Sequence, residues 1–267
     1  MTHSISFCSL KGGAGKTTVA LNSAYSFGRR GARTLLVDLD PQGAIGLSLD
    51  GVGGRPGLHA CLRDDSPPLS GVVSTRMREL HLLPVGDVPV LDVDAFAVEL
   101  REKDIVRRIL AASQGDYDVV LFDTPAGIGG ATRLALECTD NAIVVAQTEP
   151  LALRSLPRLL ELMARLRDAG NACTLLGVVG TMTSFRDPVL LASLEEVWAL
   201  YQNEVFDTSI PRDPIFLQAS RAGVPLGLLS RRPPAVAAVF DKLVAEIEER
   251  LGVEEGGADD GPIRLVD

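Results

Sequence analysis

The sequence has few cysteines and no long apolar run, and each scarcity excludes a class of protein. Its four cysteines, Cys8, Cys61, Cys138 and Cys173, form no CxxC pair, which argues against a disulfide framework or metal cluster and fits a reducing cytoplasm. No stretch reaches the roughly 18 apolar residues that a membrane span needs. No basic-then-apolar leader opens the chain, so we expect neither secretion nor membrane insertion.

Acidic charge is concentrated at one end of the sequence. The net charge of −9 by itself argues against a nucleic-acid binder. Residues 246–267 hold eight acidic and two basic side chains, so the other 245 residues carry a net charge of only −3. We therefore expect a folded body at residues 1–252 and an acidic, disordered tail at residues 253–267.

Short apolar runs alternate with longer segments of helical period. We expect strands at residues 5–10, 34–37, 80–83, 119–122, 142–146 and 174–179, and helices at 16–29, 93–112, 131–138, 151–169, 188–201 and 234–251. Residues 210–234, with five prolines, should form a loop with a short helix near 215–222. Continuous apolar strands are typical of parallel sheets covered on both faces. The sequence therefore predicts an α/β fold with a doubly wound, mainly parallel sheet.

A glycine-rich segment, SLKGGAGKTT at residues 9–18, follows the first strand and opens the first helix. It holds two of only four lysines in the chain. Glycines let successive amides turn inward around an anion, and the helix N-terminus adds its positive end. We expect a P-loop in which Lys16 neutralises the β- and γ-phosphates of ATP and Thr17 ligates Mg²⁺. The predicted nucleotide contacts are Lys11, Gly12, Gly13, Ala14, Gly15, Lys16, Thr17 and Thr18.

Two later strands end in aspartates, at the sheet edge where doubly wound folds bind ligands. DLDPQG occupies residues 38–43, and LFDTPAG occupies residues 121–127. An apolar strand closed by Asp123 has the form of a Walker B motif. We expect Asp123 to contribute to the Mg²⁺ shell.

These segments together resemble the ParA/MinD family of deviant Walker A ATPases, most closely its short ParA (Soj-type) branch. KGGAGKTT matches the deviant Walker A motif, DLDPQG matches switch I, and DTPAG matches switch II with alanine where the family more often has proline. The resemblance implies that Lys11 reaches across a dimer to the partner's nucleotide. It also implies that Asp40 orients the attacking water and that Asp38 lies near the metal. The segment at 209–214 resembles the one bordering adenine, which makes Pro211 and Asp213 candidates there.

The resemblance also implies a function. The protein would be a slow ATPase that forms a homodimer with ATP, binds DNA non-specifically and segregates or positions DNA or another cargo. A ParB-like or other protein partner would stimulate hydrolysis. Residues 150–240 carry a net charge of only +1, so a DNA-binding patch requires their arginines to cluster in space. The candidates are Arg154, Arg186, Arg221, Arg231 and Arg232.

Several alternatives stay open. An ATP-switched positioning protein could act through a protein scaffold without binding DNA. A MinD-like membrane protein would need a basic amphipathic terminal helix, and this acidic terminus does not suit anionic lipid. A reductase of the family would need more cluster cysteines than Cys138, and an enzyme of small-molecule chemistry would need grouped acid–base residues. Because the chain starts at its first strand, we expect no operator-reading helix-turn-helix. We expect a cytoplasmic protein, nucleoid-associated if it binds DNA.

Overall fold

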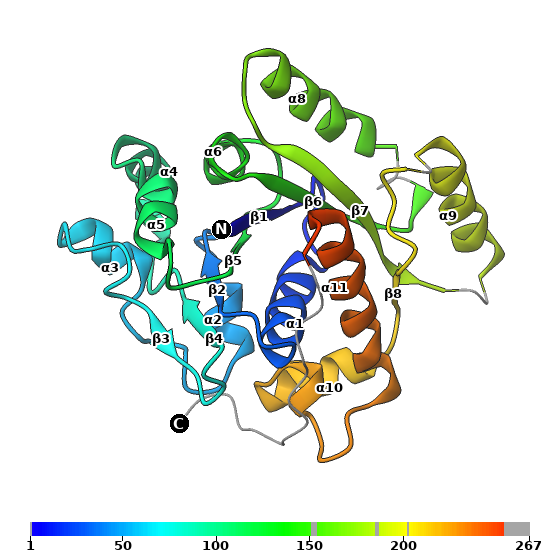
Figure 1. The fold of residues 1–267 in the computed structure, drawn as a ribbon, viewed down its shortest axis with the longest axis horizontal. Coiled ribbons are helices and arrows are strands. Elements are labelled where there is room, and N and C mark those ends of the chain that lie inside the picture. Colours follow the sequence, from blue (N-terminus) through cyan, green and yellow to red (C-terminus); the bar gives the residue numbers. More distant parts are fainter. Residues whose placement is uncertain (1, 151–153, 185–186, 202, 254–267) are drawn as a thin grey trace.

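An eight-stranded sheet runs through the computed structural model, which describes residues 2–150, 154–184, 187–201 and 203–253 (Figure 1). The strand order is β3-β4-β2-β5-β1-β6-β7-β8, and all neighbours are parallel except β3 and β4. This confirms the predicted α/β fold with a mainly parallel sheet. The strands are β1 His3–Cys8, β2 Thr34–Asp38, β3 Val73–Ser74, β4 Leu80–Leu83, β5 Val119–Asp123, β6 Asn141–Gln147, β7 Thr174–Thr183 and β8 Ile210–Pro211.

Helices cover both faces of the sheet. Helices α1 and α11 pack side by side on one face, and α4, α5, α6 and α8 pack on the other (Figure 1). The α-helices are α1 Lys16–Arg29, α2 Ala44–Ser48, α3 Leu58–Arg63, α4 Val93–Glu102, α5 Ile105–Ser113, α6 Gly130–Cys138, α8 Leu156–Asp168, α9 Pro188–Leu200, α10 Ile215–Ala222 and α11 Ala238–Leu251. Short 3-10 helices lie at η1 Val90–Asp92, η2 Leu226–Leu228 and η3 Ala235–Ala237.

Successive side chains of the central strands pack into opposite cores. On β5, Leu121 belongs to the core shared with α1 and α11, whereas Val120 and Phe122 belong to the core shared with α4, α5 and α6. Side chains alternate between the two faces along a strand. A strand with no exposed face must therefore be apolar at every position, which explains the continuous apolar runs in the sequence.

Some local expectations were wrong. The single helix expected at residues 93–112 is two helices, because Asp104 adopts a left-handed backbone conformation with φ of 46° that a helix interior excludes. Ile210–Pro211, expected in a loop, forms β8, in which Ile210 pairs with Thr181 of β7. Val73–Ser74 adds an antiparallel edge strand that was not predicted.

Two predicted segments, the helix at residues 151–169 and the tail at residues 253–267, extend beyond the described residues. The helix expected at residues 151–169 is seen as α8 from Leu156, and residues 151–153 lie outside the described part of the chain. Of the expected tail at residues 253–267, only Val253 is described. The tail therefore stays a prediction.

Gly57 lies where two loops pass each other at the carboxyl edge of the sheet. A Cβ atom here would come within 2.2 Å of the carbonyl oxygen of Pro84 and 2.6 Å of the amide nitrogen of Gly86. Both are backbone atoms, so neither can rotate away. We expect Gly57→Ala to lower the free energy of unfolding by about 3 kcal/mol. Urea denaturation measures this change.

Gly46→Ala is the matched control for that substitution. Gly46 lies within α2, and outside that helix a Cβ there would approach no described atom more closely than 4.0 Å. Because alanine is the better helix former, stability should stay the same or rise by up to about 1 kcal/mol. An equal loss of stability in both variants would contradict the steric explanation for Gly57.

Candidate functional site

The segment between β1 and α1 forms an anion-binding loop. Gly13 and Gly15 have φ values of 76° and 89°, which side-chain-bearing residues rarely adopt, so glycine is needed at both positions. Gly15 caps α1, whose first residue is Lys16, so the loop leads directly into a helix N-terminus. Successive amides in such a loop and the positive helix end together favour phosphate.

Hydrogen bonds from neighbouring segments hold the loop in shape. The Thr181 hydroxyl of β7 donates to the Ala14 carbonyl oxygen at 2.7 Å, and the Gly127 amide donates to the Ser9 carbonyl oxygen at 2.9 Å. The Ser9 hydroxyl donates to the Lys11 carbonyl oxygen, also at 2.9 Å. The loop is therefore anchored through its carbonyl oxygens, which suits a site that binds its ligand through amides.

Two buried aspartates lie beside the loop. Asp38 and Asp123 close the neighbouring strands β2 and β5 and lie opposite each other in the sheet register. Both have an exposed fraction of 0%. Asp38 accepts hydrogen bonds from the amides of Asp40 (3.0 Å) and Ile45 (3.2 Å). Neither carboxylate oxygen of Asp123 has a hydrogen-bond partner among the described residues.

The electrostatics of this pair favour a bound cation. Burial raises the pKa of Asp123 to about 7. The nearby Thr17 hydroxyl and the Lys16 ammonium partly offset that rise, although the hydroxyl does not form a hydrogen bond with the carboxylate. Burial and the charge of Asp123 raise the pKa of Asp38 well above its usual value. Carboxylate and hydroxyl oxygens are ligands that Mg²⁺ prefers. The unpartnered oxygens of Asp123 therefore fit a magnesium shell completed by Thr17.

Asp40 lies just beyond the end of β2, in a tight turn. Its Oδ1 accepts a hydrogen bond from the Gln42 amide at 2.9 Å, and its carbonyl oxygen accepts one from the Gly43 amide at 2.9 Å. Gly43 has a φ of 64°, which closes the turn. Asp40 is partly exposed, and its charge contributes to raising the pKa of Asp123. It therefore presents a carboxylate close to the buried pair, where water can approach.

A cavity of about 360 Å³ opens on the other side of the loop, between α1, β7, β8 and α10. Gly15 and Thr18 border it, so it is continuous with the anion-binding loop. Both predicted adenine contacts, Pro211 and Asp213, line it. Asp213 lies just before α10, and its Oδ1 accepts a hydrogen bond at 2.9 Å from the amide of Ile215, the first residue of that helix.

Three further lining residues were not among the predicted contacts. Met182, with a φ of 55°, lies in the cavity wall, and Phe216 and Leu217 of α10 close its far side. Met182 lies near the end of β7, three residues beyond the strand expected at 174–179, and this position at a strand's carboxyl end was a usable signal in the sequence. Phe216 and Leu217 gave none, because only the packing of α10 brings them here.

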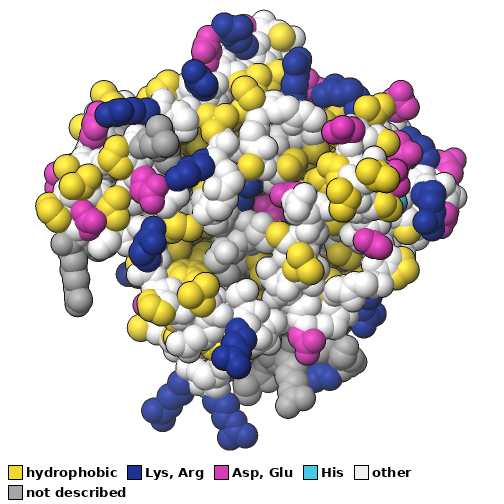
Figure 2. Space-filling view, turned by 180° about the vertical axis from the view of Figure 1, so that it is seen from behind, with side chains coloured by type: hydrophobic (Ala, Val, Ile, Leu, Met, Phe, Trp, Pro, Cys, Tyr) yellow, Lys and Arg dark blue, Asp and Glu magenta, His cyan; other side chains and the backbone are white. Residues whose placement is uncertain are grey.

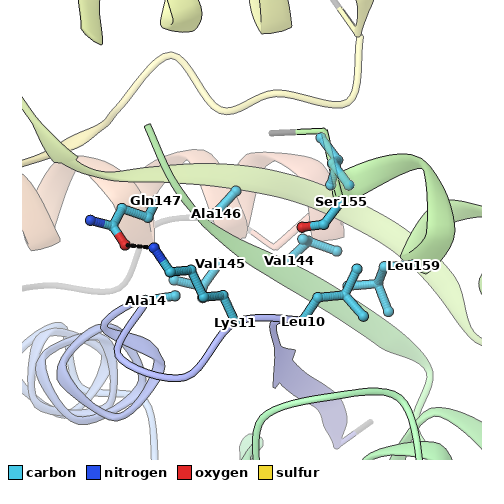
Figure 3. A pocket seen from close by; sticks show the side chains of 10 residues that line it. Leu10, Lys11, Ala14, Val144, Val145, Ala146, Gln147, Ser155 and Leu159 are labelled. Atoms are coloured by element: carbon cyan, nitrogen blue, oxygen red, sulfur yellow. Dashed lines mark hydrogen bonds between the residues drawn. The ribbon is translucent and has the colours of Figure 1, made fainter. Parts of the chain in front are cut away.

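Lys11 is the one predicted site residue whose surroundings the sequence did not indicate. It is partly exposed, and its Nζ donates to Glu149 Oε2 at 3.0 Å and to Gln147 Oε1 at 3.3 Å. Figure 3 shows Lys11 reaching from the loop toward Gln147 at the end of β6. In the free subunit this lysine therefore contacts its own chain.

The predicted DNA contacts do not all lie together. One end of the molecule holds three of them. Arg221 lies on α10, and the exposed Arg231 and Arg232 lie between η2 and η3. Arg154 lies two residues before α8, and α8 lies at the top of Figure 1 whereas α10 lies at the bottom. Arg186 lies outside the described residues. On the face shown in Figure 2, Lys and Arg side chains are widely spread with acidic ones among them, and some lie close together at the lower edge.

Comparison with known proteins finds relatives along nearly the whole chain. A family model described as an AAA domain matches residues 2–174. The chromosome-partitioning ATPase Soj of Thermus thermophilus is 32% identical, over 92% of this chain and 96% of that protein. The cobyrinic acid a,c-diamide synthase structure from Mycobacterium smegmatis, with bound ATP analog and magnesium, has a TM-score of 0.76 at 26% identity, covering 98% and 100%. The septum site-determining protein MinD complexed with Mg-ADP from Pyrococcus horikoshii OT3 has a TM-score of 0.73 at 27% identity, covering 94% and 98%.

The glycine-rich loop leading into α1 and the two buried aspartates on β2 and β5 define a P-loop NTPase. The resemblance of its motifs agrees with these full-length matches. The chain belongs to the ParA/MinD family of ATPases. Among its described helices, none is long and apolar enough to cross a membrane.

Proposed function

We propose that the protein is a ParA-type ATPase that forms a homodimer with ATP, binds DNA non-specifically in that form, and segregates or positions DNA or another cargo. A ParB-like or other protein partner would stimulate its slow hydrolysis and end the bound state. The observation that carries this proposal is a complete P-loop site with an additional lysine, Lys11, at its outer rim. The similarity to a chromosome-partitioning ATPase, which extends over 96% of that protein, supports the proposal.

Nucleotide binding follows from the shape of the site. The adenine base would enter the cavity lined by Pro211 and Asp213, and the phosphates would lie against the amides of residues 11–18. Lys16, only 7% exposed, would neutralise the β- and γ-phosphates from within the loop. Because its ammonium is largely shielded from water, its attraction to phosphate is weakly screened.

Hydrolysis is then a matter of positioning and charge. Mg²⁺, held by Thr17 and the carboxylates of Asp123 and Asp38, would neutralise charge that develops on the phosphates. Asp40 would orient the attacking water from its turn beyond β2. Lys11 of the partner would add a second lysine ammonium at the γ-phosphate, in the role that an arginine finger has in other P-loop enzymes.

The proposal includes the organisation and location of the chain. Residues 1–252 would form the ATPase domain, and residues 253–267 would form the acidic, disordered tail. The protein would be cytoplasmic and nucleoid-associated in its ATP form. The tail would keep the protein from anionic lipid, so we propose no membrane role.

DNA binding gives the proposal a direct test. With ATP and Mg²⁺, the affinity for random-sequence DNA should fall with salt by about 0.9 log units per log unit of salt for each phosphate contacted. Replacing both Arg231 and Arg232 by alanine removes up to four phosphate contacts from each dimer, so the slope should fall by up to about 3.6. Fluorescence anisotropy over a salt series measures both values. Arg63→Ala is the control, because Arg63 is exposed on α3 and paired with Asp64.

A second candidate, an ATP-switched positioning protein that acts on a protein scaffold, is favoured by one observation. Arg154 lies just before α8 and Arg221 lies on α10, two helices that are far apart in Figure 1, and acidic side chains lie among many of the cations of the face in Figure 2. Under this alternative the ATP-bound protein would show no DNA binding even at low salt. That result would exclude the DNA role and leave the ATPase role intact.

A further inference from the structure

In the free subunit, Lys11 occupies a site formed by two side chains of β6 and the residues after it. Glu149 Oε2 accepts a hydrogen bond from Lys11 Nζ at 3.0 Å, and Gln147 Oε1 accepts a second at 3.3 Å (Figure 3). Two acceptors on one ammonium give it a defined position. A surface lysine that only contacts water would have none.

The acceptor site is itself held in place. Gln147 is 7% exposed, and its Nε2 donates to Glu149 Oε1. The same oxygen lies 3.8 Å from Nη2 of Arg212. Glu149 thus turns one oxygen toward Lys11 and the other toward Gln147 and Arg212. Because Arg212 also lines the cavity assigned to the nucleotide, this cluster connects the Lys11 side of the loop with the cavity wall.

We infer that Glu149, oriented by Gln147, is a positioning residue that holds Lys11 on its own subunit until an ATP dimer forms. This inference rests on the proposed function, in which Lys11 must reach the phosphates of the partner. In this arrangement, Lys11 leaves Glu149 when it turns toward a partner's phosphate. Dimer formation would then break the Lys11–Glu149 pair in both subunits.

The Lys11–Glu149 ion pair is weak enough to form and break reversibly, and we call it the latch. The side chains of Lys11 and Glu149 are 42% and 35% exposed, so water screens their attraction. Such a pair shifts an equilibrium by about two- to fivefold. Two pairs are broken in each dimer, so together they would weaken ATP-dependent dimerisation by about 4- to 25-fold. A latch of this strength raises the protein concentration at which dimers form and does not prevent them.

The contact can be tested in the nucleotide-free subunit, without any dimer. The chain has only four lysines, so a short pulse of an amine-reactive N-hydroxysuccinimide ester, read by peptide mass spectrometry, reports each one separately. Glu149→Gln should raise the labelling rate of Lys11 by about two- to fivefold, since an ion pair is lost. The exposed Lys242 of α11 is the internal reference and should not change. Unchanged labelling of Lys11 would overturn the inference.

The consequence for dimerisation is tested in the Asp40→Ala background, where hydrolysis is blocked. With ATP and Mg²⁺, sedimentation velocity should give a dimer dissociation constant about 4- to 25-fold lower for the Glu149→Gln variant. Glu161→Gln is the matched control, because Glu161 forms a comparable exposed ion pair with Arg165 on α8. Weaker or unchanged dimerisation in Glu149→Gln would contradict the latch. Absence of an ATP dimer in the Asp40→Ala parent would instead contradict the proposed function.

Discussion

Lys16→Ala should reduce the affinity for ATP by at least about 100-fold, since removing one side of a shielded charge pair costs several kcal/mol. Lys16 is the first residue of α1 and is only 7% exposed. Water therefore has little access to this position and could not compensate for the lost ammonium beside the phosphates. The substitution also removes a cation whose charge acts on the buried Asp123. Isothermal titration calorimetry with ATP and Mg²⁺ measures the loss.

Lys242→Ala serves as the control for Lys16→Ala. Lys242 is exposed on α11, away from the loop, and its removal changes the net charge by the same amount. Its ATP affinity should match that of the unmodified protein. Normal ATP binding by Lys16→Ala, with the fold retained in far-ultraviolet circular dichroism, would contradict the P-loop assignment.

Asp40→Ala should reduce ATP hydrolysis by about 10²- to 10⁴-fold, the range found when a group that orients or deprotonates a nucleophile is removed. ATP binding should be nearly unchanged, because Asp40 lies beyond β2 and outside the cavity and the loop. An ATP-bound dimer should therefore accumulate. Size exclusion with light scattering measures the dimer, and phosphate release measures the rate.

Asp50→Ala is the matched control for Asp40→Ala. Asp50 is exposed after α2, and the described hydrogen bond of its backbone, from its amide to the Gly223 carbonyl oxygen, does not need its side chain. Its hydrolysis rate should equal that of the unmodified protein. Loss of the ATP dimer in Asp40→Ala would show that Asp40 is required for assembly and would contradict its role with water.

The sequence predicted the parts of the site that depend on local geometry. Gly13 and Gly15 allow backbone conformations that other residues avoid, and a strand that ends in Asp38 or Asp123 places its carboxylate at a known edge of the sheet. These residues needed only their neighbours in the chain to be interpreted. Their side-by-side register in the structure follows from the parallel sheet that the same sequence predicts.

Features that depend on distant contacts could not be predicted in this way. Glu149 follows a strand and is far from Lys11 in sequence, and only the neighbouring positions of β1 and β6 bring them together. Phe216 and Leu217 enter the cavity wall only because α10 packs there. The left-handed conformation of Asp104, which divides the helix expected at 93–112, has no local sequence signal.

The central claim, that each nucleotide site uses Asp40 of its own subunit and Lys11 of the partner, can be tested by mixing two inactive variants. Lys11→Ala and Asp40→Ala should each hydrolyse ATP poorly alone. In a mixed dimer, the Lys11→Ala subunit retains Asp40 and receives Lys11 from its partner, so one complete site forms. An equal mixture should regain about a quarter of the unmodified activity, since half of randomly paired dimers are mixed and each has one complete site. No recovery on mixing, with mixed dimers verified by differently tagged subunits, would contradict the claim.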